Sequence, residues 1–159
     1  MRSDESPVAM DLILWRHAEA EPGEPDLGRR LTAKGIKQAD RMALWLDTHL
    51  PDTCRILVSP ADRAQQTALA LKRKFRTVPE LAPGATVEAV LTAAGWPDAR
   101  EPALVVGHQP TLGEVAAFLV SGQDAYWSVR KGAVWWLSNR VRENSTAVVV
   151  RVIIGPDFV

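Results

Sequence analysis

The sequence predicts an α/β protein, a three-layer α/β/α sandwich whose mostly parallel sheet carries an antiparallel hairpin at one edge. Three observations predict this fold. Short apolar runs such as residues 11–15 (DLILW) and 103–107 (ALVVG) are typical of strands buried on both faces of a parallel sheet. Segments with helical periodicity separate these runs, as in strand–helix–strand units. The last two apolar runs, residues 133–137 and 147–154, are separated by a polar turn, which favours an antiparallel pair.

Composition limits the classes of partner. The chain has 159 residues, of which 47% are hydrophobic and 24% charged, as in an ordinary globular protein. Its 19 basic and 19 acidic side chains balance, which argues against nucleic acid or a membrane surface as partner because both require a basic excess. Cys54 is the one cysteine, so an intrachain disulfide and a site of several thiolates are excluded.

The organisation of the chain is simple. We expect residues 1–9, which are polar and acidic, to form a disordered N-terminal extension, and residues 10–159 to form a single domain. The N-terminus lacks the pattern of a signal peptide, and no apolar run approaches the length that spans a bilayer. We therefore expect a cytoplasmic protein.

The first half of the chain reads as strand, loop, helix and strand. The strand at residues 11–15 is followed at 19–30 by a loop rich in Pro, Gly and charge. A helix then begins after Thr32, a good N-cap residue, and keeps apolar residues at helical spacing up to Leu50. Residues 55–59 (RILVS) form the second predicted strand.

The next segments predict two helices with a short strand between them. Residues 59–62 (SPAD) match a capping box, which predicts a helix running towards Phe75. Residues 78–81 predict a short edge strand, since their proline argues against a central position. Residues 86–95 predict an amphipathic helix that ends at its final glycine.

The last part of the chain returns to the sheet. The buried strand at residues 103–107 leads into a second capping box at 111–114 (TLGE), which predicts a helix to about residue 120. The C-terminal hairpin is expected to turn at residues 143–145, which are polar.

Residues able to bind a phosphate follow three of the predicted strands. Arg16 and His17 come directly after the first strand, Arg63 follows the second, and His108 follows the strand at 103–107. Each has an ordinary structural explanation when taken alone. However, the carboxyl ends of parallel strands meet at one edge of a sheet, so these side chains are expected to lie close together. Arg63 is also predicted on the first turn of a helix, where the helix dipole disfavours a cation unless an anion is bound.

This set of side chains suits phosphoryl transfer. Two guanidinium groups, those of Arg16 and Arg63, can hold the oxygens of a phosphoryl group, and a neutral imidazole can attack phosphorus. The two arginines are expected to lower the pKa of His17 and keep it neutral, while a bound dianion favours a protonated His108. Because neither step requires a metal or another cofactor, we expect none.

Four segments of the chain resemble motifs of one family, the histidine phosphatase (phosphoglycerate mutase-like) superfamily. In chain order they are residues 14–20 (LWRHAEA), 31–39 (LTAKGIKQA), 58–67 (VSPADRAQQT) and 106–110 (VGHQP). Within the superfamily the chain is most similar to the SixA-type phosphohistidine phosphatases, given its short length, the segment PELAP and the terminal hairpin.

The resemblance implies a phosphoglycerate mutase-like fold and assigns roles to residues. His17 is implied to be the nucleophile, with Arg16, Arg63 and His108 forming the phosphate pocket. Ser59 and Gly107, which belong to the same motifs, are expected to support that pocket.

The proton donor is left open by the sequence. Glu80 and Glu19 are candidates, but both are equally well explained as solvated loop carboxylates. A phosphohistidine can also leave as an imidazole that is protonated on its other nitrogen, and then no strong acid is required.

Three functions remain open at this point. The first is a phosphatase acting on a phosphorylated protein such as a phosphotransfer domain, since the chain is too short for a substantial lid and an open pocket suits a protein substrate. The second is a phosphomonoesterase acting on a small phosphorylated metabolite. A mutase is disfavoured, because it must shield its phosphoenzyme from water. The third is a non-catalytic phosphate-binding module, against which the presence of His17 argues.

Overall fold

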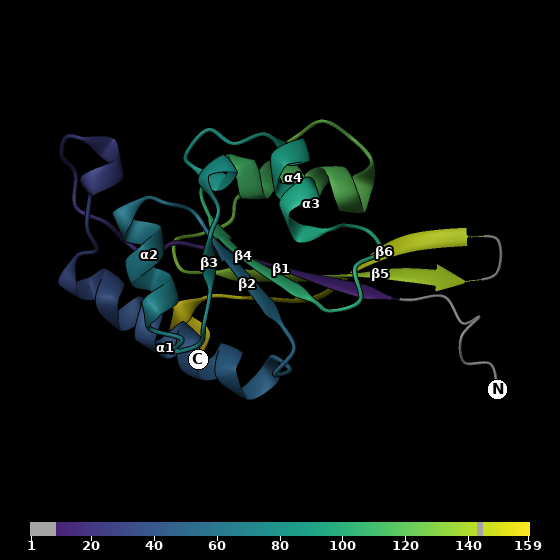
Figure 1. The fold of residues 1–159 in the computed structure, drawn as a ribbon, viewed down its shortest axis with the longest axis horizontal. Coiled ribbons are helices and arrows are strands. Elements are labelled where there is room, and N and C mark those ends of the chain that lie inside the picture. Colours follow the sequence, from purple (N-terminus) through teal and green to yellow (C-terminus); the bar gives the residue numbers. More distant parts are fainter. Residues whose placement is uncertain (1–8, 143–144) are drawn as a thin grey trace.

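Ten helices and strands, with three short 3-10 helices, make up the part of the chain that the computed structural model describes, residues 9–142 and 145–159 (Figure 1). The strands are β1 (Met10–Arg16), β2 (Arg55–Val58), β3 (Arg76–Thr77), β4 (Ala103–Gly107), β5 (Val134–Arg142) and β6 (Ser145–Ile154). The helices are α1 (Ala33–His49), α2 (Asp62–Leu69), α3 (Val87–Ala94) and α4 (Thr111–Ser121). The 3-10 helices are η1 (Asp26–Gly28), η2 (Pro79–Leu81) and η3 (Pro156–Phe158). Of the expected N-terminal extension, residues 1–8 lie outside the described residues. Of the expected hairpin turn, residues 143 and 144 lie outside them.

The six strands form one mixed sheet in the order β3-β2-β4-β1-β5-β6. The first four of these pair in parallel, whereas β5 runs antiparallel to β1 and β6 runs antiparallel to β5. The prediction of a mostly parallel sheet with an antiparallel edge hairpin is therefore confirmed. In the register of the central pair, Arg16 of β1 lies opposite Gly107 of β4.

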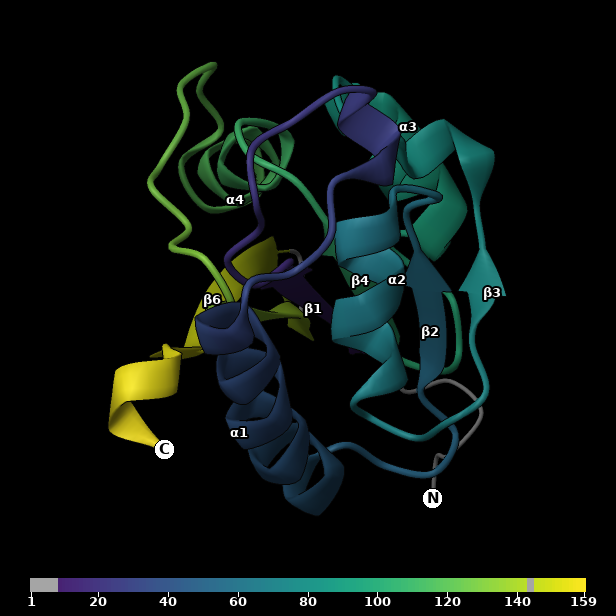
Figure 2. The same cartoon turned by 90° about the vertical axis from the view of Figure 1, so that its left-hand side faces the viewer.

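Helices cover both faces of the sheet and create two separate cores (Figure 2). Because side chains alternate along a strand, Leu12 and Leu14 of β1 face the core that includes residues of α3 and α4. Ile13 and Trp15 face the core beneath α1 and α2. The three predicted layers are thus present, and β1 is buried from both sides. No helix in the described part of the chain is long and apolar enough to cross a membrane.

The predicted N-cap Thr32 is confirmed, and Thr86, predicted as the first residue of a helix, is the N-cap of α3. The side chain of Thr32 accepts a hydrogen bond from the backbone N–H of Gly35, and that of Thr86 accepts one from Ala89. Both threonines have extended backbone angles, as N-cap residues require.

The capping box predicted at residues 59–62 is wrong. Helix α2 begins after Ala61, and the hydroxyl of Ser59 instead accepts from the Ala61 N–H and lies 2.7 Å from His108 Nε2. The helix also ends at Leu69 rather than near Phe75. Lys72, with a φ of 57°, reverses the chain there so that β3 can pair with β2.

The second capping box, at residues 111–114, is wrong for a similar reason. Thr111 is the first residue of α4, and its hydroxyl donates to the carbonyl oxygen of Ala85. The acceptor for the Gly113 N–H is the side-chain oxygen of Gln109. The helix was predicted correctly, but a different side chain satisfies its N-terminus.

The predicted strand at residues 78–81 is also wrong. The strand at this edge is β3, two residues earlier, and Pro79–Leu81 is the 3-10 helix η2. Proline has the fixed φ that suits the first position of a helical turn and lacks the N–H that a strand pair would use.

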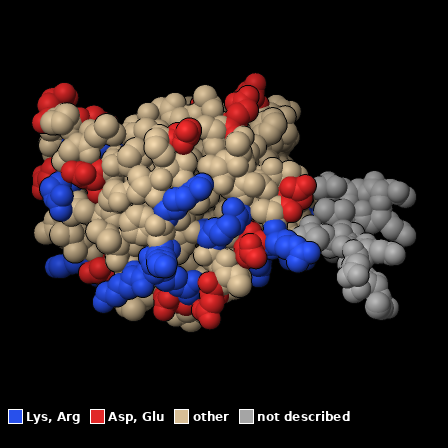
Figure 3. Space-filling view, viewed as in Figure 1, with Lys and Arg blue, Asp and Glu red and all other residues tan. Residues whose placement is uncertain are grey.

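Charged side chains do not form a continuous basic surface on the face seen in Figure 3, where Lys and Arg are interspersed with Asp and Glu. This distribution agrees with the formal net charge of zero.

Candidate active site

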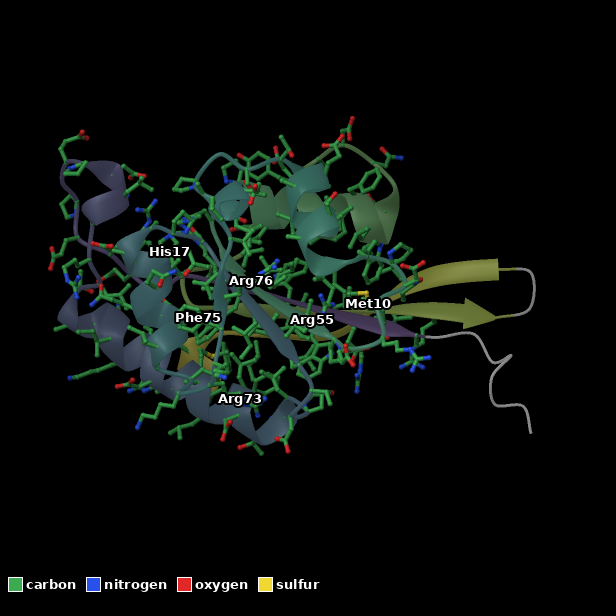
Figure 4. All side chains as sticks on the ribbon, viewed as in Figure 1. Met10, His17, Arg55, Arg73, Phe75 and Arg76 are labelled. Carbon is green, nitrogen blue, oxygen red and sulfur yellow. The ribbon has the colours of Figure 1, made fainter. Side chains whose placement is uncertain are left out.

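The carboxyl ends of three strands meet at one edge of the sheet, as the sequence predicted. Beyond the end of β1, the N–H of His17 donates to the carbonyl oxygen of Gly107 at 3.1 Å. Beyond β2, the N–H of Ser59 donates to Val106 at 3.1 Å. In Figure 4, Met10 and His17 lie at opposite ends of β1, and His17 is at the end close to α2.

The imidazole of His17 is buried and held in one orientation. Its Nδ1 lies 2.7 Å from the carbonyl oxygen of Ala18, which can only accept, so Nδ1 carries a proton and Nε2 keeps its lone pair. Burial, assisted by the charges of Arg63 and Arg16, lowers the pKa of His17 to about 4. The ring is therefore neutral at neutral pH. The sequence attributed this to the arginines, but burial is the larger cause.

His108 lies beside His17, with their ring centroids 5.1 Å apart. Its Nε2 lies 2.7 Å from Ser59 Oγ, whereas its Nδ1 is buried and has no hydrogen-bond partner. Burial, followed by the proximity of His17 and Arg63, lowers the pKa of His108 to about 3. The imidazole is neutral in this structure, and the protonated form expected beside a bound dianion stays a prediction.

Two arginines complete this cluster. The Nη1 of Arg16 donates to the carbonyl oxygen of Val129 at 2.9 Å. Burial, together with the charge of Arg63, lowers the pKa of Arg16. Four buried side-chain nitrogens lack a partner in the described part of the chain, and three of them belong to the cluster: Arg16 Nε, Arg63 Nε and His108 Nδ1. Since buried polar groups are nearly always paired, three unpaired ones at one place indicate a site for a ligand rich in acceptors.

Side chains of the motif segments hold the backbone that follows β1. The N–H of Ala18 donates to Thr67 Oγ1 at 3.0 Å, and the N–H of Glu19 donates to Gln38 Oε1 at 2.9 Å. These acceptors come from α2 and α1. The backbone that follows His17 is therefore held by two helices that are distant from it in sequence.

Gly35 permits the closest of these approaches. A Cβ on Gly35 would lie 2.0 Å from the carbonyl oxygen of Glu19, far inside van der Waals contact. Any larger residue would push the first turn of α1 away from the loop that carries His17.

The two candidate proton donors lie in different surroundings. Glu19 is half-buried, and its Oε2 accepts from the hydroxyl of Thr32 at 2.9 Å. Glu80 is exposed on η2, and its side chain makes no hydrogen bond or ion pair with any described residue. Glu19 is thus hydrogen-bonded to the N-cap residue of α1. Glu80 forms no hydrogen bond with His17 or His108. The described residues contain no group of three or more His, Cys, Asp or Glu that could hold a metal ion.

Sequence reasoning missed two residues of this cluster, Asp26 and Arg29. Asp26, on η1, accepts from Arg29 Nη1 at 3.1 Å and from Arg63 Nη2 at 3.2 Å. The hydrogen bonds from Arg29 and Arg63 hold the pKa of Asp26 below its usual value. The sequence did place Asp26 three residues before Arg29, a spacing that allows an ion pair. Nothing in the sequence showed that this loop folds back onto Arg63.

Comparison with known proteins shows which family the chain belongs to. The model of the histidine phosphatase superfamily (branch 1) matches residues 12–85. A phosphohistidine phosphatase SixA homolog of Haemophilus influenzae is 33% identical over 126 residues, covering 69% of this chain and 77% of that protein. The solved structure of a putative phosphohistidine phosphatase SixA from Nakamurella multipartitia has a TM-score of 0.78 at 26% identity, covering 94% of this chain and 98% of that one. A structure of the protein histidine phosphatase SixA complexed with tungstate has a TM-score of 0.73 at 25% identity, covering 94% and 99%.

Proposed function

Because the chain belongs to the histidine phosphatase superfamily, and within it resembles the SixA-type enzymes, we propose that it hydrolyses phosphohistidine on a protein through a covalent intermediate on His17. One observation carries this proposal. Three unpaired buried nitrogens, on Arg16, Arg63 and His108, lie in the cluster around the free Nε2 of His17. A phosphoryl group supplies the acceptor oxygens that such donors lack.

The first step transfers the phosphoryl group to His17. Its Nε2 lone pair attacks phosphorus while the bond to the leaving group breaks, and the electron pair of that bond goes to the leaving atom. Positive charge develops on the His17 ring, and the contact between Nδ1–H and Ala18 stabilises it. Arg16, Arg63 and His108 hold the non-bridging oxygens, on which the negative charge of the transition state lies.

The second step returns the enzyme to its starting state. A water molecule attacks phosphorus, the bond between phosphorus and His17 Nε2 breaks, and its electron pair returns to Nε2. Phosphate leaves with the oxygen and one proton of that water, and the second proton is released to solvent. The low pKa of His17 keeps the regenerated imidazole neutral and ready for another cycle.

Two observations support a protein as the substrate. Two curated relatives that are 32–33% identical to the chain are named as a phosphohistidine phosphatase SixA or its homolog. The arginine-bound acid at the site, Asp26, has a half-exposed side chain. A phosphotransfer domain, whose histidine is presented on a folded surface, would need such open access. A cytoplasmic location stays a prediction from the sequence.

The first test is phosphate release from a phosphorylated histidine-containing phosphotransfer domain, beside a panel of small phosphomonoesters. His17→Ala serves as the catalytic variant. His49→Ala is a matched control, because His49 lies exposed at the C-terminal end of α1, where its Nδ1 contacts the carbonyl oxygen of Trp45.

Fast release from the protein substrate, lost in His17→Ala and kept in His49→Ala, is the expected result. Turnover of a small ester alone would keep the mechanism but reject the protein substrate. Absence of turnover with every substrate would leave a phosphate-binding module as the function.

A further inference from the structure

The carboxylate of Asp26 is bound to the same guanidinium group that the phosphate pocket uses. Arg63 donates its Nη2 to Asp26 Oδ2 at 3.2 Å and its Nη1 to the backbone oxygen of Asp26 at 2.8 Å. The second carboxylate oxygen accepts from Arg29 at 3.1 Å. Any phosphoryl oxygen that reaches Arg63 therefore comes to lie next to an acidic side chain.

Asp26 lies on the solvent side of Arg63. The Asp26 side chain is 51% exposed, whereas that of Arg63 is 5% exposed. A substrate whose phosphoryl group is bound by Arg63 has this exposed carboxylate beside it. Asp26 is also close enough for its charge to oppose the fall in the pKa of His108.

The carboxylate is poorly suited to donate a proton. Two arginines hold its pKa below the usual value, so it stays ionised at neutral pH and can only accept hydrogen bonds. An acceptor at the rim of a phosphate pocket repels the phosphoryl oxygens and favours a leaving group that carries an N–H.

We propose that Asp26 is a specificity-determining residue, which accepts a hydrogen bond from the free ring N–H of the substrate's phosphohistidine. This role rests on the proposed function. An imidazole leaving group presents an N–H to the carboxylate, and a charge-assisted hydrogen bond forms. The leaving oxygen of a phosphate ester has no such donor and gains negative charge close to the carboxylate, which is unfavourable.

The chemistry of the step is balanced without an acid from the enzyme. The substrate imidazole takes a proton from water on its free nitrogen before the transfer. As the bond from His17 Nε2 to phosphorus forms, the phosphorus–nitrogen bond of the substrate breaks, and its electron pair stays on the substrate nitrogen. The substrate histidine leaves as a neutral imidazole whose remaining N–H still points to Asp26. Neither Glu19 nor Glu80 is required.

The test compares two substrates in matched variants. The kcat/KM of wild type, Asp26→Asn and Asp26→Glu is measured with a phosphorylated phosphotransfer domain and with p-nitrophenyl phosphate, an ester whose leaving group has no N–H. Glu24→Gln is the control, because Glu24 is an exposed acid of the same loop and its substitution changes net charge equally. Thermal unfolding of each variant shows that it is folded.

In Asp26→Asn we expect kcat/KM for the phosphotransfer domain to fall about tenfold or more relative to kcat/KM for the ester, the effect of losing a charge-assisted hydrogen bond. Asp26→Glu keeps the charge and should retain part of the preference for the phosphotransfer domain over the ester. Glu24→Gln should retain all of this preference.

Two kinds of result would overturn the inference: an unchanged substrate preference in Asp26→Asn, or failure of wild type on the protein substrate. An equal loss on both substrates would mean that Asp26 only positions Arg63, and an equal gain would mean that it only obstructs the pocket. If wild type fails on the phosphotransfer domain, the proposed function itself is rejected, together with this role. If wild type succeeds and Asp26→Asn keeps the same substrate ratio, only the role of Asp26 is rejected.

Discussion

The Nδ1 atom of His17 lies 2.7 Å from the carbonyl oxygen of Ala18, and this contact determines which ring nitrogen is free to react. The carbonyl oxygen can only accept, so the proton is on Nδ1 and the lone pair on Nε2. The orientation follows from the backbone immediately after β1, where Ala18 is itself held by Thr67.

We expect the phosphoenzyme to carry its phosphate on Nε2 of His17. Rapid quenching in base during turnover should trap it, because phosphohistidine is labile in acid, and NMR of the trapped protein can distinguish the two phosphohistidine isomers. Phosphate on Nδ1 would contradict the tautomer assigned here. His17→Ala should give no labelled protein under the same conditions.

Ser59→Ala should lower kcat/KM without preventing folding. The substitution removes the hydroxyl that lies 2.7 Å from His108 Nε2, and a lost hydrogen bond of this kind costs about 1 kcal/mol, or roughly fivefold in rate. Steady-state kinetics with the phosphotransfer domain measure the effect. Ser121→Ala is the control, because that hydroxyl donates to Ala117 at the far end of α4. If both variants kept full activity, Ser59 would have no part in positioning His108.

Gly35→Ala should destabilise the protein strongly, whereas Gly28→Ala should not. A Cβ at Gly35 would lie 2.0 Å from the Glu19 carbonyl oxygen, so backbone must move; at Gly28 the nearest atom is 3.6 Å away, on Pro25. We expect a loss of about 2–4 kcal/mol for the first variant and less than about 1 kcal/mol for the second. Urea denaturation gives both values. Equal stabilities would show that the loop after β1 can shift without cost.

Stability should decrease in mild acid because of the two buried histidines. A histidine of the unfolded chain titrates near pH 6.5, but His17 and His108 titrate at about 4 and about 3 in the folded protein. Above pH 6.5 both states are neutral and the two groups contribute no pH dependence. Between pH 6.5 and about 4 the unfolded state binds protons that the folded state does not, so the free energy of unfolding falls by up to about 1.4 kcal/mol per pH unit for each histidine.

Urea denaturation at pH 7, 6 and 5 measures this slope, and the double variant His17→Gln, His108→Gln is the comparison. We expect the double variant to have the shallower pH dependence. The same slope in both proteins would mean that the buried histidines are protonated in the folded state.

The centre of the sheet was predictable because β1, β2 and β4 are short, mostly apolar runs, whereas the polar edge strand β3 was misplaced. The runs at β1 and β4 were predicted within one residue at each end, and the parallel arrangement followed from the helices between them. The N-cap Thr32 was predictable because it precedes an amphipathic segment. Local sequence was sufficient to predict an element wherever the hydrogen bonds at its ends were formed within that element.

The two capping boxes were predicted wrongly because their hydroxyl groups form tertiary hydrogen bonds instead of capping a helix. The hydroxyls of Ser59 and Thr111 match capping boxes in the sequence, but they bond instead within the His108 site and to Ala85. The positions of Arg16, His17, Arg63 and His108 at one sheet edge followed from the order of the strands. The contact between Asp26 and Arg63 did not, because it depends on the path of a loop with no periodic pattern.

Several contacts that form the site cross almost the whole length of the chain. The indole Nε1 of Trp15 donates to Gly132, whose own N–H donates to the carbonyl oxygen of His17, and the N–H of Arg16 donates to Ala133. A ribosome-bound nascent chain therefore carries His17 long before it carries the residues that hold the backbone around His17. Only after the segment around Ala133 has left the exit tunnel can β5 join β1 and these hydrogen bonds form.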